Sequence, residues 1–115
     1  MKLSEAIRLG SMLHPQGFGK FHAHNETHEI VASCALGAAE DAGYSIMESY
    51  NRIDIFACPR HGCGSCFINL GELIVHMNDI HRMSRERIAD HIESIEIKAL
   101  SEQVKKTETL ELIKV

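Results

Sequence analysis

The sequence predicts a mainly α (α+β) domain, in which four or so helices surround a small unit of two strands and one helix. Apolar residues recur at helical spacing near both ends of the chain, and a stretch rich in cysteine and histidine, residues 56–81, lies between them. The length of 115 residues suits one modest core. Because 44% of the residues are apolar, only 5% are aromatic and none is tryptophan, that core is expected to be aliphatic.

A single domain, 1–115, is expected to contain four parts in order. Residues 1–50 form an N-terminal helical part, residues 53–82 a metal-binding unit, and residues 84–105 a C-terminal helix. Residues 106–115 form a strand or a tail. The elements that support this division follow in chain order.

The first element is an amphipathic helix over residues 3–13. Ser4 is a fair N-cap and Pro15 ends the helix, which a loop with two glycines follows. The apolar residues at helical spacing are Leu3, Ala6, Ile7, Gly10 and Leu13.

Three histidines after this loop, His22, His24 and His28, form an H-x-H-x3-H cluster. Three imidazoles can make an open metal site of the catalytic kind, with water as the fourth ligand. A solvated loop whose histidines titrate near neutrality is the alternative.

The pattern predicts a second helix over residues 26–42, with Asn25 or Thr27 as its cap and Gly43 as its stop. The helix is rich in small residues, so Cys34 on its apolar face is interpreted as a small buried hydrophobic residue. A short helical piece is expected at 45–50. A strand is expected at 52–57, where isoleucines alternate with Asp54.

The metal-binding unit contains two cysteines and two histidines in the order C-x4-C-x12-H-x4-H. They are Cys58, Cys63, His76 and His81. Two thiolates on a short turn and two imidazoles at the end of a helix suit one tetrahedral zinc ion, and binding would accompany local folding. Such a closed site gives zinc a structural role.

The segment from Phe56 to His81 resembles the classical two-cysteine, two-histidine zinc finger. Phe56, Phe67 and Leu73 match its apolar positions, as the four metal ligands match its ligand positions. The resemblance implies a turn at 59–66 and a helix at about 69–81. Replacement of one ligand by the nearby Cys66 or His61 is the alternative.

The segment departs from DNA-reading zinc fingers at the positions that would contact bases. These positions fall on Asn69, Glu72 and Val75, of which only Asn69 suits a base and Glu72 has the wrong charge near phosphates. The helix is also apolar on most sides. We therefore expect it to be one wall of a larger core.

Ser84 is expected to cap the C-terminal helix, whose apolar face carries Ile88, Ile92, Ile95 and Ala99. Arg82, Arg85 and Arg87 give its start a basic patch, and the preceding short turn resembles a helix-turn-helix arm. A DNA-binding regulator that uses the basic helix 82–98 is therefore an alternative function.

The C-terminal segment TLELIKV alternates so that Leu110 and Leu112 share one face. It is expected to add an edge strand beside 53–57, to contact a second copy of the chain, or to fray.

The runs at 3–10, 33–43 and 78–93 resemble small phage- or prophage-encoded proteins of unknown function. A net charge of −4 argues against sequence-independent nucleic-acid binding, and no signal peptide or membrane-spanning run is evident. Clustered cysteines indicate that the thiols are reduced metal ligands and that the protein is cytoplasmic.

The leading hypothesis is a non-enzymatic zinc protein that binds a protein partner or forms a homodimer. A metalloenzyme built on the three histidines is the third hypothesis.

Overall fold

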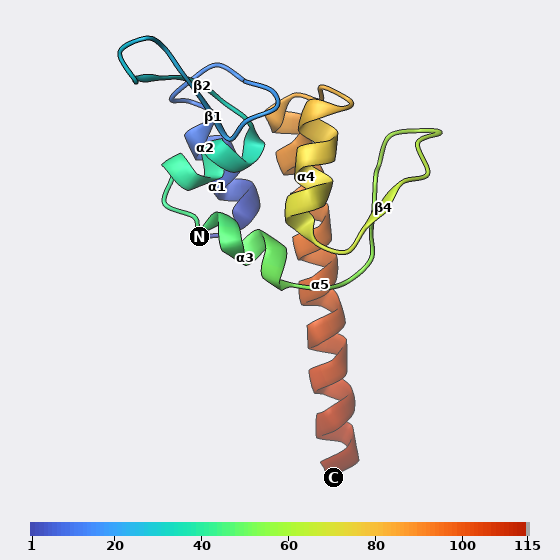
Figure 1. Cartoon of the computed structure of the whole chain (residues 1–115). Helices are drawn as coiled ribbons and strands as arrows, with labels where there is room; N and C mark the ends of the chain where they lie inside the picture. Colours follow the sequence, from blue (N-terminus) through green and yellow to red (C-terminus); the bar gives the residue numbers. More distant parts are fainter. Residues whose placement is uncertain (115) are drawn as a thin grey trace.

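A computed structural model describes the backbone of residues 1–114 and the side chains of residues 1–107. Within these residues the chain forms five helices and two small antiparallel sheets, which confirms the mainly α (α+β) fold (Figure 1). The elements are α1 (Leu3–Gly10), β1 (His22–His24), β2 (Ile30–Ser33), α2 (Ala35–Asp41), α3 (Ile46–Asn51), β3 (Phe56–Ala57), β4 (Cys66–Phe67), α4 (Leu70–Asp79) and α5 (Arg85–Lys114).

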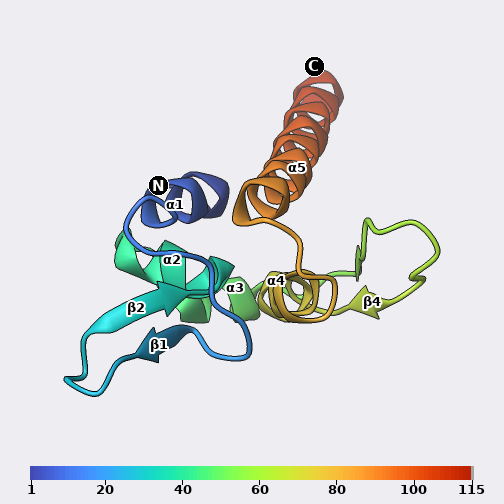
Figure 2. The same ribbon diagram turned by 90° about the horizontal axis from the view of Figure 1, so that it is seen from above.

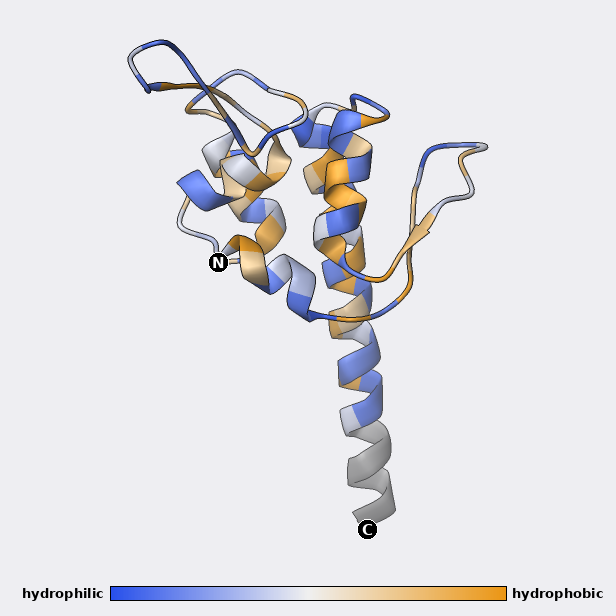
Figure 3. Cartoon of the chain, viewed as in Figure 1, coloured by the Kyte–Doolittle hydropathy of each residue, from blue (hydrophilic) through white to orange (hydrophobic). Residues whose placement is uncertain are grey.

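The core lies where α1, α2 and α4 meet the first half of α5. α1 packs against α2 and α5, and α4 contacts α2, α3 and α5. Figure 3 shows apolar residues gathered at this junction, whereas the part of α5 that projects from it is largely hydrophilic. The largest apolar side chains in the core are aliphatic, as expected: Ile7, Leu36, Leu73, Ile74, Met77, Ile88 and Ile92.

The two sheets are separate hairpins on opposite sides of α4, as the view from above shows (Figure 2). β1 pairs with β2, and β3 pairs with β4 in the register Phe56↔Phe67 and Ala57↔Cys66. The second hairpin leads directly into α4. It therefore joins this helix in the strand–strand–helix order of the expected metal-binding unit.

The buried side chains of Asn78 and Arg85 make hydrogen bonds to the loop that follows α1. Asn78 in α4 is fully buried and makes four hydrogen bonds, with Gln16, Gly17, Ala35 and Asp79. Arg85 donates through Nη1 to the carbonyl and hydroxyl oxygens of Ser33, and through Nη2 to the carbonyls of Ser11 and His14. Burial lowers the pKa of Arg85 from its ordinary value.

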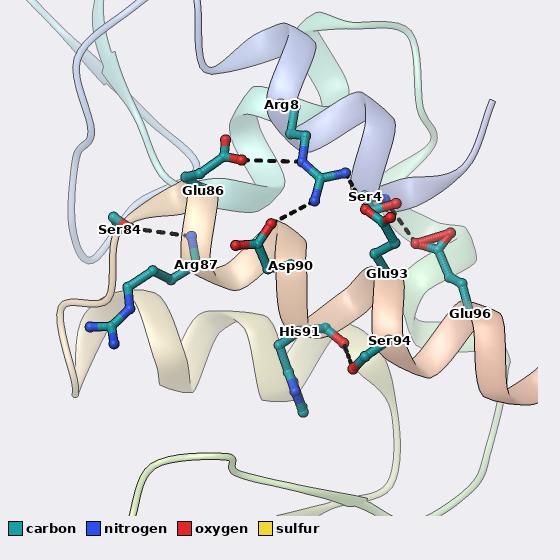
Figure 4. Close-up of polar contacts among 10 residues, drawn as sticks. All are labelled: Ser4, Arg8, Ser84, Glu86, Arg87, Asp90, His91, Glu93, Ser94 and Glu96. Carbon is teal, nitrogen blue, oxygen red and sulfur yellow. Dashed lines mark hydrogen bonds and ion pairs between the residues drawn. The ribbon is translucent and has the colours of Figure 1, made fainter.

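The outer face of α5 is joined to α1 through ion pairs (Figure 4). Arg8 contacts Glu86 at 3.4 Å, Asp90 at 2.7 Å and Glu93 at 2.5 Å. Because Glu86, Asp90 and Glu93 occupy successive turns, one guanidinium bridges three carboxylates and reduces the repulsion among them.

The expected helix over 26–42 is wrong in its first half. Residues 30–33 form β2, and α2 begins only at Ala35, with Cys34 rather than Asn25 or Thr27 as its N-cap. The N–H of Ser33 donates to Pro15 and that of Cys34 to Phe21. These partners lie earlier in the chain, so a pattern within 26–42 does not reveal them.

Other boundaries also differ from the sequence-based expectations. α1 ends at Gly10 rather than residue 13, and the strand predicted at 52–57 is reduced to Phe56–Ala57, with Ile53 and Ile55 exposed. The predicted C-terminal edge strand is wrong, because α5 continues to Lys114; Val115 lies outside the described residues. The short helix near 45–50 is present as α3, with Ser45 at its N-cap position.

Candidate metal centre

The turn between β3 and β4 positions both candidate thiolates. The N–H of Cys58 donates to the Ser65 carbonyl at 2.9 Å, and that of Cys63 donates to the Arg60 carbonyl at 3.1 Å. Gly62 and Gly64 have φ values of 80° and 70°, in the left-handed region that glycine enters without strain. The two cysteines therefore lie on one tight turn.

α4 and the residues after it position both candidate imidazoles. The Asn69 side chain caps the helix by accepting the Glu72 N–H at 2.8 Å. His76 lies in the last turn, and the His81 N–H donates to its carbonyl at 3.4 Å. The chain then turns at Arg82, whose φ is 49°. Both rings consequently face the cysteine turn.

The four candidate ligands form one cluster. Donor atoms of Cys58, Cys63, His76 and His81 all lie within 4.8 Å of one another. The Sγ of Cys63 is 3.4 Å from Nε2 of His76 and 3.3 Å from Nε2 of His81. A tetrahedral zinc ion with bonds of about 2.0–2.3 Å separates its donor atoms by roughly 3.3–3.8 Å. The donor set suits such an ion, and the two distances from Cys63 to the imidazoles match its spacing.

Comparisons with protein-family models, with curated proteins and with solved structures find no match for this chain. The likeness to a zinc finger therefore rests on the residues and the geometry of the segment from Phe56 to His81.

The two thiols of the cluster differ in their tendency to ionise. The pKa of Cys63 is lowered to about 5, first by hydrogen bonds from the Ser65 hydroxyl and N–H, then by His76 and His81. Burial raises the pKa of Cys58. Metal coordination requires thiolates, so Ser65 favours the binding form of one ligand before a cation arrives. Sequence analysis missed Ser65; its place two residues after Cys63 was the available signal.

The apolar residues of the unit connect the cluster to the core. Phe56 and Leu73 are buried, and the ring of Phe67 lies 4.8 Å from that of His76. Phe67 and Cys58 both pack against the main hydrophobic cluster. α4 is thus one wall of the larger core, as its apolar residues on most sides predicted.

The alternative ligands and the base-reading position lie elsewhere. Cys66 is exposed in β4 and His61 is exposed on the turn, and neither belongs to the cluster found among the described residues. Asn69 is buried and occupied as the cap of α4. It is therefore not free to contact a base.

The three histidines near the N-terminus do not form a metal cluster within the described part of the chain. The Nε2 atom of His22 lies 2.9 Å from Oδ1 of Asp41 and 3.1 Å from the Gly37 carbonyl, so its ring faces α2. His28 is exposed on the β1–β2 turn with a φ of 65°. The alternative second metal site at His22, His24 and His28 is therefore not assembled in this part of the chain.

Of the three arginines expected to form a basic patch at the start of α5, Arg85 is not available at the surface. Arg85 is buried and bound to Ser33, Ser11 and His14. Arg82 lies 4.4 Å above the ring of Phe18. Arg87 is exposed, and its N–H is bonded to the capping Ser84 hydroxyl. A DNA contact that uses all three arginines is incompatible with the buried role of Arg85.

Proposed function

We propose that this protein binds one zinc ion in a structural role and is not an enzyme. The observation that supports this is the mutual proximity of the Cys58, Cys63, His76 and His81 donor atoms. Two thiolates and two imidazoles fill a tetrahedral shell, so water has no coordination position from which to react. The ion would supply a cross-link between the hairpin and α4.

The cross-link is useful because local packing alone holds the hairpin weakly. β3 and β4 are two residues each, and a hairpin of this size is marginal in water. α4, by contrast, is anchored in the core by Leu73, Ile74 and Met77. By linking the hairpin to α4, zinc would therefore stabilise the folded hairpin against the core.

We further propose that the protein acts through a protein partner, in the cytoplasm, as expected for a phage- or prophage-type protein. The projecting part of α5 carries exposed apolar side chains at the spacing of a helix that packs on another helix. These are Ile97 (57% exposed), Leu100 (57%) and Val104 (49%). No helix among the described residues combines the length and the apolarity that a bilayer crossing requires.

Metal analysis of the purified chain tests the structural role. We expect one zinc per chain by elemental analysis, and a lower melting temperature when a chelator removes it. Two ions per chain would contradict a single closed site. An unchanged melting temperature after complete zinc removal would contradict a structural role.

Light scattering with size exclusion tests whether the partner is a second copy. A dimer that becomes a monomer in Leu100→Lys would identify self-association through α5. A monomer in both chains would exclude self-association through these side chains.

A further inference from the structure

A cleft of about 520 Å³ lies between the cysteine turn and the first turns of α5. The turn contributes Arg60 and His61, the residues between the two cysteines, and α5 contributes Arg87 and His91. Pro59, Met83 and Asp90 complete the lining. The cleft adjoins the metal centre but includes none of its four candidate ligands.

The fixed charges of this cleft are predominantly positive. The Arg87 side chain makes no hydrogen bond or ion pair within residues 1–107, and Arg60 makes one bond, from Nη1 to the His81 carbonyl at 3.3 Å. The one carboxylate in the lining, Asp90, is already paired with Arg8 at 2.7 Å. Two guanidinium groups therefore face the cleft with most of their donors unused, although the chain as a whole carries a net charge of −4.

The helical phase of α5 places Arg87 and His91 in the cleft lining and leaves Glu86 and Glu93 outside it, whereas Asp90 is in the lining and is paired with Arg8. Arg87 and His91 are four positions apart and so share a face, whereas Glu86, Asp90 and Glu93 all bind Arg8. In Figure 4, Arg87 and His91 point away from Arg8. The Nε2 of His91 is buried and has no hydrogen-bond partner among the described residues.

We propose that this cleft binds the phosphate group of a small phosphorylated molecule. Guanidinium groups bind phosphate oxygens through paired, charge-assisted hydrogen bonds, and two of them on opposite walls suit a group with several oxygens. The volume exceeds what a single phosphate needs, so there is room for the rest of a small ligand. A long nucleic acid fits less well, because Glu86, Asp90 and Glu93 lie on the same helix and Arg85 is buried.

This proposal goes beyond the structural zinc site, although the two share the cysteine turn. Zinc at Cys58 and Cys63 would hold Arg60 and His61 in place as one wall. The other wall, on α5, is fixed by Ser84 and by the core residues Ile88 and Ile92. Zinc content and phosphate binding are therefore measured separately for each variant.

The experiment titrates the zinc-loaded full chain with inorganic phosphate and with adenosine monophosphate, followed by two-dimensional NMR at constant ionic strength. We expect saturable shifts confined to residues near Arg60, Arg87 and His91. Each of Arg60→Gln and Arg87→Gln should weaken binding about tenfold, as loss of a hydrogen bond to a charged group does. Arg52→Gln is the matched control, since Arg52 is exposed outside this cleft.

Binding of phosphate alone and binding of the nucleotide alone both support the proposal, and they separate a bare ion from a phosphorylated ligand. Equal shifts with chloride, equal binding by Arg87→Gln and Arg52→Gln, or binding of only a duplex oligonucleotide would overturn it. If Arg60→Gln loses zinc, Arg87→Gln decides the outcome, because that residue is remote from the ligands in sequence and lies on α5.

Discussion

The Oδ1 atom of Asn78 accepts the backbone N–H of Ala35 at 3.2 Å, which joins the helix of the candidate metal centre to the first turn of α2. Asn78 lies two residues after His76 and is fully buried. Its amide also holds the loop after α1 through Gln16 and Gly17. A displacement of α4 is therefore expected to alter the packing of α2 and of the loop after α1, because Asn78 is hydrogen-bonded to both.

Replacing Asn78 with leucine should lower the free energy of unfolding by about 2–4 kcal/mol, because the Ala35 N–H and the Gly17 carbonyl would lose their buried partner. Urea denaturation measures the change. Asn51→Ala is the control, since Asn51 is exposed at the end of α3. Equal stability of the two variants would show that the buried amide contributes little.

Cys63→Ser should remove zinc binding, whereas Cys66→Ser should leave it intact, because only Cys63 lies in the four-residue cluster. We expect the melting temperature to fall by at least about 10 °C in the first variant, as loss of several kcal/mol of metal binding would require. Calorimetry with elemental analysis checks both effects. Loss of zinc in Cys66→Ser, with zinc retained in Cys63→Ser, would identify Cys66 as the second thiolate.

The lowered pKa of Cys63 gives the metal-free protein a specific pH dependence. Its folded-state pKa of about 5 lies below the ordinary value of 9.0, so the unfolded chain binds more protons between these values. The contribution of Cys63 to stability should therefore be present above pH 9 and be lost as pH falls through about 5. Unfolding measurements across this range, made on the metal-free chain, should show this slope, and Cys63→Ser should remove it.

Alkylation provides an independent measure of the same thiolate. In metal-free Cys66→Ser at neutral pH, Cys63 should react with iodoacetamide before Cys58 and Cys34, because burial raises the pKa of both other thiols. Ser65→Ala should slow this reaction, because it removes the hydroxyl whose hydrogen bond lowers the pKa of Cys63 most. Equal rates at all three cysteines would contradict the lowered pKa of Cys63, and an unchanged Cys63 rate in Ser65→Ala would contradict the role of the Ser65 hydroxyl.

Gly10→Ala should destabilise the protein by about 1–3 kcal/mol, as overpacking does. A Cβ at position 10 would lie 1.6 Å from the Ala38 carbonyl oxygen, so α1 and α2 would have to separate. The sign of the effect is informative, because alanine in an unconstrained helix would add stability of about 1 kcal/mol. Thermal unfolding measures the change in stability, and Glu5→Ala, at an exposed position of α1, is the control.

The sequence by itself determined the features that depend on local spacing. Ser84 capping α5, the short helix near 45–50, and the strand–strand–helix order around Cys58 and His76 all follow from residues within one or two turns of each other. The aliphatic core follows from composition. That the four clustered residues bind zinc stays a prediction, which their spacing first suggested and their proximity supports.

Only the tertiary structure decided which long-range partners the backbone and the polar side chains would find. Residues 30–33 became a strand because the segment His22–His24 was available as an antiparallel partner, although their local pattern favours a helix. Arg85 became an internal link and Arg87 remained exposed, although the sequence places both in one basic run. The physical reason is that burial and hydrogen bonding depend on neighbours brought together by packing, which periodicity along the chain does not encode.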